Sequence, residues 1–123
     1  MSLPPGHPGP LHPALAGGEG WRLPARLNMA EEVCDRWAEA EPGRAAILEP
    51  AGGELSVTTY GELRAMADAL ARRLAATGVG RGDRVGVLRS QSPWTAAAHV
   101  AIWKLGAISI PLFVLFGDRA LAE

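Results

Sequence analysis

An α/β fold is predicted by three features that follow one another along the chain. Residues 84–88 form a short apolar run, the next segment carries apolar residues at helical spacing, and 107–116 is a second apolar, β-branched run. Strand, helix and strand in this order make a βαβ unit, in which we expect parallel strands joined by a right-handed crossover. Residues 83–116 should therefore organise the remaining elements, with helices packed on a small sheet.

The helix inside this unit has clear predicted ends. Ser92 can cap its first turn, and Pro93 fits the first helical position, where a missing N–H costs nothing. Gly106 comes directly after the last apolar residue, where many helices end in a left-handed conformation. The predicted apolar stripe consists of Trp94, Ala97, Ala98, Ala101, Ile102 and Leu105.

Another helix is expected to begin near Asn28. Asn28 would cap it, and Glu31, three residues later, resembles the second half of a capping box. Pro42 and Gly43 should end it. Its solvent-exposed face is predicted to carry Glu32, Asp35, Arg36 and Glu39, and its buried stripe Ala30, Val33, Cys34, Trp37 and Ala38.

A short β-hairpin and a longer helix are predicted between these two helices. Two extended runs, 44–49 and 54–58, flank the turn-forming residues 50–53. Thr59 and Glu62 then form a second capping box at the start of a helix. This helix is predicted to end before Gly78, and its apolar stripe comprises Leu63, Met66, Ala67, Leu70, Ala71 and Leu74.

Composition excludes several classes of function. A formal net charge of −1 and a sequence pI near 6.3 give no reason to expect nucleic acid or an acidic membrane as a partner. Cys34 is the only cysteine, so the chain cannot form an internal disulfide, and we expect this thiol in the core.

Residues 1–20 hold five prolines and five glycines, which predicts a disordered head before a domain at 21–123. The head resembles no secretory signal, so we expect a cytoplasmic protein.

From the residues alone we predict no catalytic, cofactor-binding or metal-binding side chain. Residues 78–82 look like a glycine-rich phosphate loop, but a helix precedes them and a strand follows, so helix carbonyls would face the loop. They are therefore predicted to form an ordinary turn. Residues 90–93, beside Arg89, have the correct polarity for an anion, although most such loops bind nothing. His99 lacks an acidic or histidine partner nearby and is predicted to face away from the apolar stripe, without a catalytic role.

A membrane span is one alternative for residues 94–116. These 23 residues contain only His99 and Lys104 as ionisable groups, and about 20 apolar residues can cross a bilayer. Lys104 would lie near the bilayer centre at a cost of about 2.5–3.5 kcal/mol, and Gly106 and Pro111 would interrupt the helix. A buried helix followed by a buried strand explains the same residues without this cost, so we prefer it.

Several segments, taken in order, resemble a known family. Residues 57–63 (VTTYGEL) with 78–85 (GVGRGDRV), and then 103–112 (WKLGAISIPL), resemble two core motifs of AMP-forming acyl-CoA synthetases and their adenylate-forming relatives. Residues 28–40 resemble the opening helix of the acetate and medium-chain branch. The resemblance covers 21–123 and implies that this segment is the amino-terminal part of a ligase domain.

The resemblance implies a two-step ligase of fatty acid metabolism that uses ATP, Mg²⁺ and CoA. Such enzymes hold ATP with a Ser/Thr/Gly-rich loop ending in Lys, an aromatic-Gly-x-Thr-Glu-type segment and a ribose-binding Asp, and they carry a catalytic Lys in a mobile C-terminal domain. These motifs are absent from the sequence, so the chain alone is predicted to be inactive. The residues that match the motifs, to which we assign scaffold roles only, are Tyr60, Leu63, Lys104, Gly106 and Pro111.

The predicted partners follow from the predicted sheet. Asp118 resembles the cap of a further helix, and a sheet that ends with the preceding strand would leave one edge unpaired. We expect this edge to pair with the remainder of the ligase or with a second copy of the chain. The alternative function is a stand-alone, non-catalytic α/β module that associates through the same edge, and the membrane-anchored protein is the less favoured one.

Overall fold

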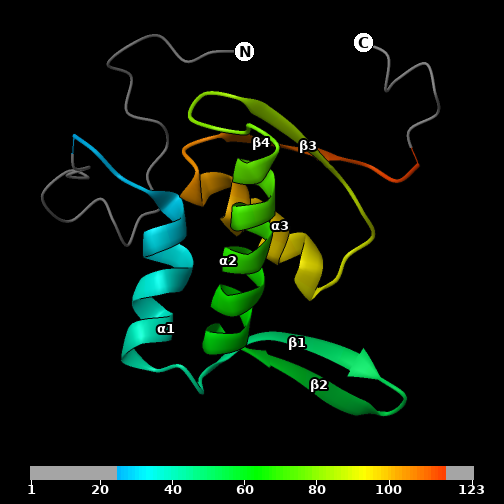
Figure 1. Ribbon diagram of the computed structural model, residues 1–123. Helices are drawn as coiled ribbons and strands as arrows, with labels where there is room; N and C mark the ends of the chain where they lie inside the picture. Colours follow the sequence, from blue (N-terminus) through cyan, green and yellow to red (C-terminus); the bar gives the residue numbers. More distant parts are fainter. Residues whose placement is uncertain (1–24, 116–123) are drawn as a thin grey trace, which may run out of the picture.

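The computed structural model of the chain describes residues 25–115, and Figure 1 shows their arrangement. The predictions for the head at 1–20 and for a helix at Asp118 lie outside the described residues. The elements, in chain order, are η2 (Glu31–Asp35), α1 (Arg36–Ala40), β1 (Ala45–Ala51), β2 (Glu54–Thr59), α2 (Tyr60–Ala76), β3 (Arg84–Leu88), α3 (Pro93–Lys104) and β4 (Ile108–Leu112).

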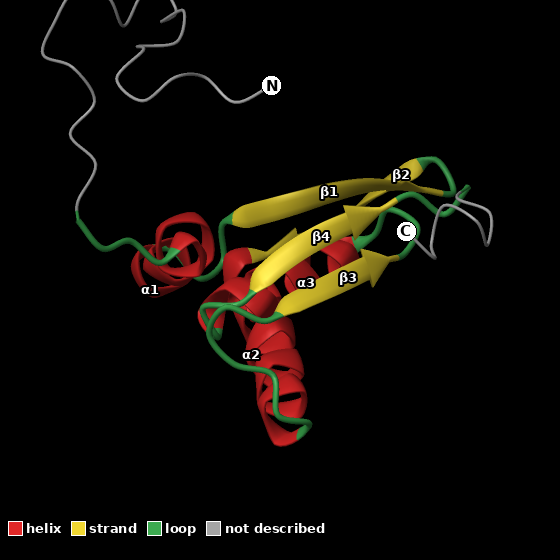
Figure 2. Cartoon of the chain, turned by 90° about the horizontal axis from the view of Figure 1, so that it is seen from above, coloured by secondary structure: helices red, strands yellow, loops and turns green. Residues whose placement is uncertain are grey.

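The predicted βαβ unit is confirmed. β3 and β4 pair in parallel, with Arg84 opposite Ile108 and Leu88 opposite Leu112, and α3 connects them. Val87, Ile102 and Ala107 are buried together between this sheet and α3. In the view of Figure 2 the two strands lie in front of α3, and the helix covers only the far face of the sheet.

The described part of residues 94–116 does not form the single continuous helix that the membrane-spanning alternative needs. α3 ends at Lys104 after 12 residues, Gly106 takes a left-handed conformation with φ +69°, and the chain continues as strand β4. Among the described helices, none combines the length and the apolar character that a bilayer span needs.

The hairpin is confirmed, with a tighter turn than predicted. β1 and β2 pair antiparallel, and only Gly52 and Gly53, both with positive φ, connect them. Two consecutive positive φ values match the right-handed twist of the strands, which explains the two glycines. Pro50 was expected in the turn, but it lies within β1 opposite Leu55. Within the described residues β1 pairs only with β2, so a proline without an N–H donor is tolerated there.

Helix α2 begins and packs as its sequence predicts. The Glu62 backbone N–H donates to the Thr59 hydroxyl at 3.2 Å, and the Thr59 backbone N–H donates to the Glu62 carboxylate at 2.8 Å. Leu63, Ala67 and Ala71 are buried. Alanine dominates the core where α2 meets its neighbours, which lets the helices approach closely; this core comprises Ala30, Cys34, Leu63, Ala67, Ala71, Ala97, Val100 and Ala101.

The first helical segment, which consists of η2 and α1, differs from the prediction in its winding. The Asn28 side chain accepts a hydrogen bond from the Ala30 N–H at 2.9 Å, but Glu31 makes no reciprocal capping bond among the described residues. The Arg36 N–H donates to the Glu31 carbonyl, five residues back, as in a π-helix. The wider turn buries every fourth residue (Ala30, Cys34, Ala38), and Val33, which was predicted to be buried, is exposed.

The start of α3 also corrects two predictions. Pro93 occupies the first turn as expected, but the Ser92 side chain makes no capping bond to the backbone. Its hydroxyl oxygen lies 3.4 Å from the Thr95 hydroxyl and accepts from Arg89 Nε at the same distance. Trp94 was assigned to the apolar stripe but is exposed, and Thr95 is buried instead. The Thr95 hydroxyl donates to the Ser90 carbonyl at 2.7 Å, which compensates for its burial.

We expect Gly106→Ala to destabilise the chain. At φ +69° an alanine is strained, and its Cβ would lie 3.4 Å from the Arg81 side chain. A left-handed non-glycine residue costs about 1–2 kcal/mol, which should lower Tm by about 5–10 °C in a domain of this size. Gly80→Ala is the control, because no atom lies within 4 Å of its added Cβ. Equal Tm values for the two variants in a thermal melt would contradict this account.

Candidate functional site

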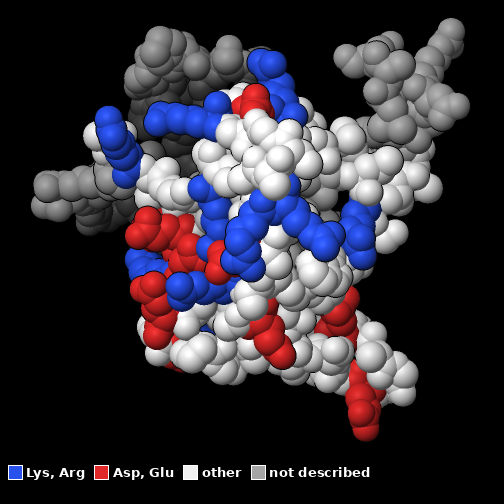
Figure 3. Space-filling view, in the orientation of Figure 1, with Lys and Arg blue, Asp and Glu red and all other residues white. Residues whose placement is uncertain are grey.

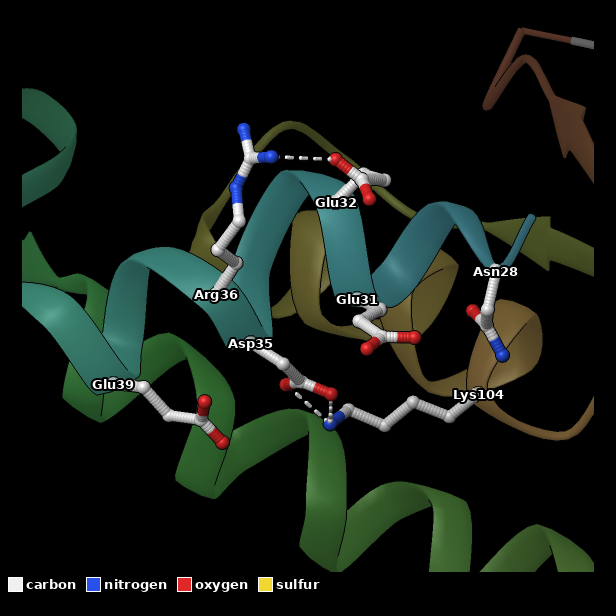
Figure 4. Close-up of a pocket in the computed structure, with 7 residues that line it drawn as sticks. All are labelled: Asn28, Glu31, Glu32, Asp35, Arg36, Glu39 and Lys104. Carbon is white, nitrogen blue, oxygen red and sulfur yellow. Dashed lines mark hydrogen bonds and ion pairs between the residues drawn. The ribbon is translucent and has the colours of Figure 1, made fainter. Parts of the chain in front are cut away.

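A charged side chain in the described region reaches across three helical segments. Lys104 lies in the last turn of α3, and its ammonium donates to both Asp35 oxygens, at 2.5 and 2.6 Å. The same nitrogen lies 2.8 Å from Asp68 Oδ1 of α2. Only 15% of the Lys104 side chain is exposed. Figure 4 shows the lysine stem running beneath the first helix towards the Asp35 carboxylate.

Further charges surround this ammonium. Arg64 of α2 lies 3.9 Å from Asp35, 3.9 Å from Asp68 and 3.6 Å from Glu39. Two cations therefore face three carboxylates where the first helix, α2 and α3 meet, and we call these five residues the Lys104 cluster. In Figure 3, basic and acidic side chains interleave over α1 and α2. The alternation of sign allows the charges to lie close together without like-charge repulsion.

The surroundings of the Lys104 cluster keep its lysine protonated. Partial burial by itself lowers the pKa of Lys104, but the hydrogen bonds to Asp35 and Asp68 outweigh burial and raise the pKa above its ordinary 10.5. A nucleophilic or general-base lysine requires the opposite shift. The neighbouring Cys34 is equally unsuited to chemistry, because burial first and then the Asp35 charge raise the pKa of its thiol.

A cleft opens beside the Lys104 cluster. Its volume is about 320 Å³ and its walls are mostly charged. Arg36 and Glu32, 3.0 Å apart, form an ion pair across one helical turn on its rim, as Figure 4 shows. Within residues 25–115, no three His, Cys, Asp or Glu side chains converge as they would to hold a metal ion. The residues that line the cleft are Asn28, Glu31, Glu32, Asp35, Arg36, Glu39 and Lys104.

Several polar groups of the loop between β3 and α3, which has the correct polarity for an anion, bond to one another. Thr95, Ser92 and Ser90 bond to one another as described above. A cleft of about 240 Å³ adjoins this loop and the carboxyl ends of both strands. His99 lines this cleft and is half-buried. Its ring lies 5.9 Å from that of Trp103.

The glycine-rich loop at 78–82 adopts the predicted turn. The Gly80 N–H donates to the Asp83 carboxylate at 2.8 Å. Gly78 and Gly82 both have positive φ, which the turn between α2 and β3 requires. A carboxylate within the chain thus occupies an N–H that a phosphate loop would offer to its ligand.

The five motif residues lie at different places in the fold. Tyr60 stacks on Trp37 with ring centroids 6.0 Å apart, and Leu63 is in the core. Lys104 belongs to its cluster, and Gly106 follows α3 with a positive φ. Pro111 lies in β4 opposite Val87. The fold does not bring the five together into one site.

The sequence patterns did not indicate the two partners of the buried lysine. Asp35 was assigned to a solvent-exposed face, and Asp68 was not singled out. Asp35 lies 69 residues from Lys104 in the chain. A local signal did exist: a lone lysine in an apolar helix needs an acidic partner if it is buried. That signal predicts a partner but does not identify it.

Comparison with known proteins places the chain in a family. The sequence model described as "AMP-binding enzyme" matches residues 34–123, which is well over half of the chain. The protein belongs to the AMP-binding enzyme family. This membership confirms the resemblance noted in the sequence.

The similar AMP-binding enzymes are much longer than this chain. Acetyl-coenzyme A synthetase 1 of Candida albicans is 33% identical over 107 residues, which cover 84% of this chain and 16% of the relative. The human protein named acetyl-coenzyme A synthetase 2-like, mitochondrial, is 34% identical over 110 residues, with 86% and 16% covered. The chain therefore spans about a sixth of the length of these relatives.

Solved structures of similar proteins share the fold. Brucella canis acyl-CoA synthetase superposes with a TM-score of 0.68 and 33% identity, covering 77% of this chain and 17% of that one. The N-terminal subdomain of Klebsiella oxytoca NpsA gives a TM-score of 0.67 at 25% identity, covering 78% and 24%. The α/β arrangement described above is thus the one found in adenylate-forming ligases.

We expect Lys104→Met to destabilise the chain by about 2 kcal/mol, because removing one partner of a buried ion pair leaves uncompensated charge. Two carboxylates, Asp35 and Asp68, would then share the remaining Arg64. Arg72→Met, an exposed change on the same α2, is the matched control and should stay within about 0.5 kcal/mol of the parent. Urea unfolding measures both, and a Lys104→Met midpoint equal to that of the control would contradict the account.

The stabilisation by Lys104 should disappear at alkaline pH. Its pKa is raised in the folded state, so folding favours the protonated form, and the contribution is complete below the ordinary pKa of 10.5. It is lost as pH rises through the higher folded-state pKa. The difference in unfolding free energy between the parent and Lys104→Met should therefore be constant from about pH 7 to 9 and shrink above 10.5. Lys104→Arg stays charged, so the difference in unfolding free energy between Lys104→Arg and Lys104→Met should show no such decline. If the difference between the parent and Lys104→Met stays constant up to about pH 12, the assignment is refuted.

Proposed function

We propose that this chain supplies the amino-terminal scaffold of an AMP-forming acyl-CoA synthetase. In the proposed parent reaction, a carboxylate attacks the α-phosphorus of ATP to give an acyl-adenylate and pyrophosphate. The thiol of CoA then takes the acyl group and releases AMP. The observation that carries this proposal is the family match over residues 34–123, supported by the similarity to proteins named acetyl-coenzyme A synthetase.

Acetate or another short carboxylic acid is the substrate that we propose. Acetyl-coenzyme A synthetases from Candida albicans, Eremothecium gossypii and Kluyveromyces lactis match 84–87% of the chain at 33–34% identity. ATP, Mg²⁺ and CoA would be the co-substrates and metal of the whole enzyme. The role in fatty acid metabolism and the cytoplasmic location stay predictions, and one similar protein is named as mitochondrial.

We further propose that the chain alone does not catalyse adenylation. Phosphoryl chemistry depends on many donors and on Mg²⁺ around the triphosphate. Lys104 is the only lysine in the sequence, and both oxygens of Asp35 and one of Asp68 hold its ammonium. It therefore has no free position from which to bind a phosphate. Within the described residues, the Lys104 cluster and the motif residues hold helices and turns in place.

Exchange of pyrophosphate into ATP tests the proposal that the chain alone does not catalyse adenylation. With acetate, propionate or hexanoate present, we expect the purified 123-residue chain to give no exchange above the protein-free blank. A full-length enzyme, acetyl-coenzyme A synthetase 2 of Saccharomyces cerevisiae, serves as the positive control. Acid-dependent exchange by the chain alone, abolished when the chain is heat-denatured, would show that it holds a complete nucleotide site.

A further inference from the structure

The β3–β4 sheet presents an apolar outer face. Residues paired in a parallel register point to the same side, so Arg84, Gly86 and Leu88 share this face with the residues opposite them. Leu88 and Ile108 are about half exposed, at 51% and 50%, and Ile110 is 38% exposed. The side chain of Leu112 lies over Gly86, with Cδ1 3.0 Å from the position of a Cβ on that glycine. The face is therefore apolar apart from Arg84 at one end.

The opposite face of the same sheet is already covered. Val87 is buried there together with Ile102 of α3 and with Ala107. Parallel strands are normally covered on both faces, because the connections between them place helices on each side. An isolated two-stranded sheet is also only marginally stable in water. Figure 2 looks onto the outer face and shows no described helix over it.

The two free edges of this sheet differ. The Ile108 N–H donates to the Asp83 carbonyl at 2.7 Å, which fixes the alternation of backbone groups along both strands. Ile108, Ile110 and Leu112 therefore direct their N–H groups towards β3, whereas Ser109 and Pro111 lie at the free edge of β4. Proline has no N–H, so the free edge of β4 has no donor at Pro111. This edge is poorly suited to accept a further strand.

The free edge of β3 carries a complete set of donors. By the same alternation, Asp83, Val85 and Val87 face β4, and Arg84, Gly86 and Leu88 direct their N–H and C=O groups outward. Within the described residues β3 pairs with β4 alone. An unpaired edge with regular donors and no proline is a template for strand addition.

We propose that the outer face of the β3–β4 sheet and the free edge of β3 form one docking surface for the polypeptide that corresponds to the rest of the relatives' length. That polypeptide would add a strand to the edge of β3 and lay an apolar segment over Leu88 and Ile110. The inference rests on the proposed function, since the chain spans only 16–17% of similar synthetases. The free edge of β4 does not take part in this docking.

Co-purification tests the proposal. The partner is Brucella canis acyl-CoA synthetase, 33% identical to this chain, from which the segment aligned with the chain has been deleted. Co-expressed with the 123-residue chain, it should be captured through a tag on the chain at a 1:1 ratio. Leu88→Pro removes a donor from the free edge of β3, and Ile110→Glu puts a charge on the outer face. Each should reduce capture at least tenfold.

Matched controls separate docking from folding. Ser109→Pro removes the corresponding donor from the free edge of β4 and should leave capture unchanged, as should Ala69→Glu on the exposed side of α2. Circular dichroism establishes which variants fold, and Ile110→Glu alone decides the question if Leu88→Pro does not. Capture that is equal in all variants, absent for the parent chain, or lost in Ser109→Pro but kept in Leu88→Pro would overturn the proposal.

A second copy of the chain is the competing occupant. Light scattering of the chain alone should show a monomer, and a dimer that Leu88→Pro dissolves would overturn the proposal in favour of self-association. Capture does not depend on catalysis, so the docking proposal and the proposed function can be tested independently of each other. Specific capture without pyrophosphate exchange by the complex would keep the docking surface and remove the proposed function. If the complex exchanges pyrophosphate, and neither Leu88→Pro nor Ile110→Glu affects its formation, the proposed function is kept and the docking surface is removed.

Discussion

The arrangement of the three helical segments depends on one ammonium group. Lys104 is largely buried, and burying an unpaired charge is costly, so it requires carboxylates from its neighbours. Asp35 comes from the first helical segment and Asp68 from α2, and each is within hydrogen-bonding distance of the same nitrogen. Because the three donors of one ammonium diverge, the pairing restricts how α3 can rotate or slide against both partners. The apolar core then packs around this constraint.

Small side chains make that constraint geometrically possible. Ala30, Ala67 and Ala97 are fully buried where the helices meet. Larger residues there would keep the helices too far apart for the lysine to reach both carboxylates. The π-turn acts in the same direction, because its wider spacing places Ala30, Cys34 and Ala38 on one buried side with Asp35 beside them. Packing and charge pairing therefore depend on each other.

The arrangement of the helices leaves polar and apolar groups in different situations. The described charges that lie close together pair with one another, and the glycine turn uses the Asp83 carboxylate for its own N–H. The apolar outer face of β3–β4, in contrast, has no described cover. The described residues thus combine paired charges with an outer sheet face that no described segment covers, which fits the proposed scaffold role. This agrees with membership in a family whose similar proteins are about six times as long.

Local signals in the sequence determined most of the secondary structure. Thr59 and Glu62 predicted the start of α2, Pro93 that of α3, and the β-branched runs predicted the βαβ unit, because caps and periodicity act within a few residues. The same reasoning located Pro50 wrongly, since tolerance of a proline in a strand depends on whether a neighbouring strand pairs with it. It also placed Asp35 in solvent and Trp94 in the core.

The sequence by itself thus determined the elements and the family resemblance, but not the acidic partners of Lys104. Only the tertiary structure decided that these partners are Asp35 and Asp68, and that the free edge of β3, unlike that of β4, keeps all its backbone donors. The physical reason is that both outcomes depend on groups distant in the chain. Helix packing sets the first, and the parity of the backbone hydrogen bonds between paired strands sets the second.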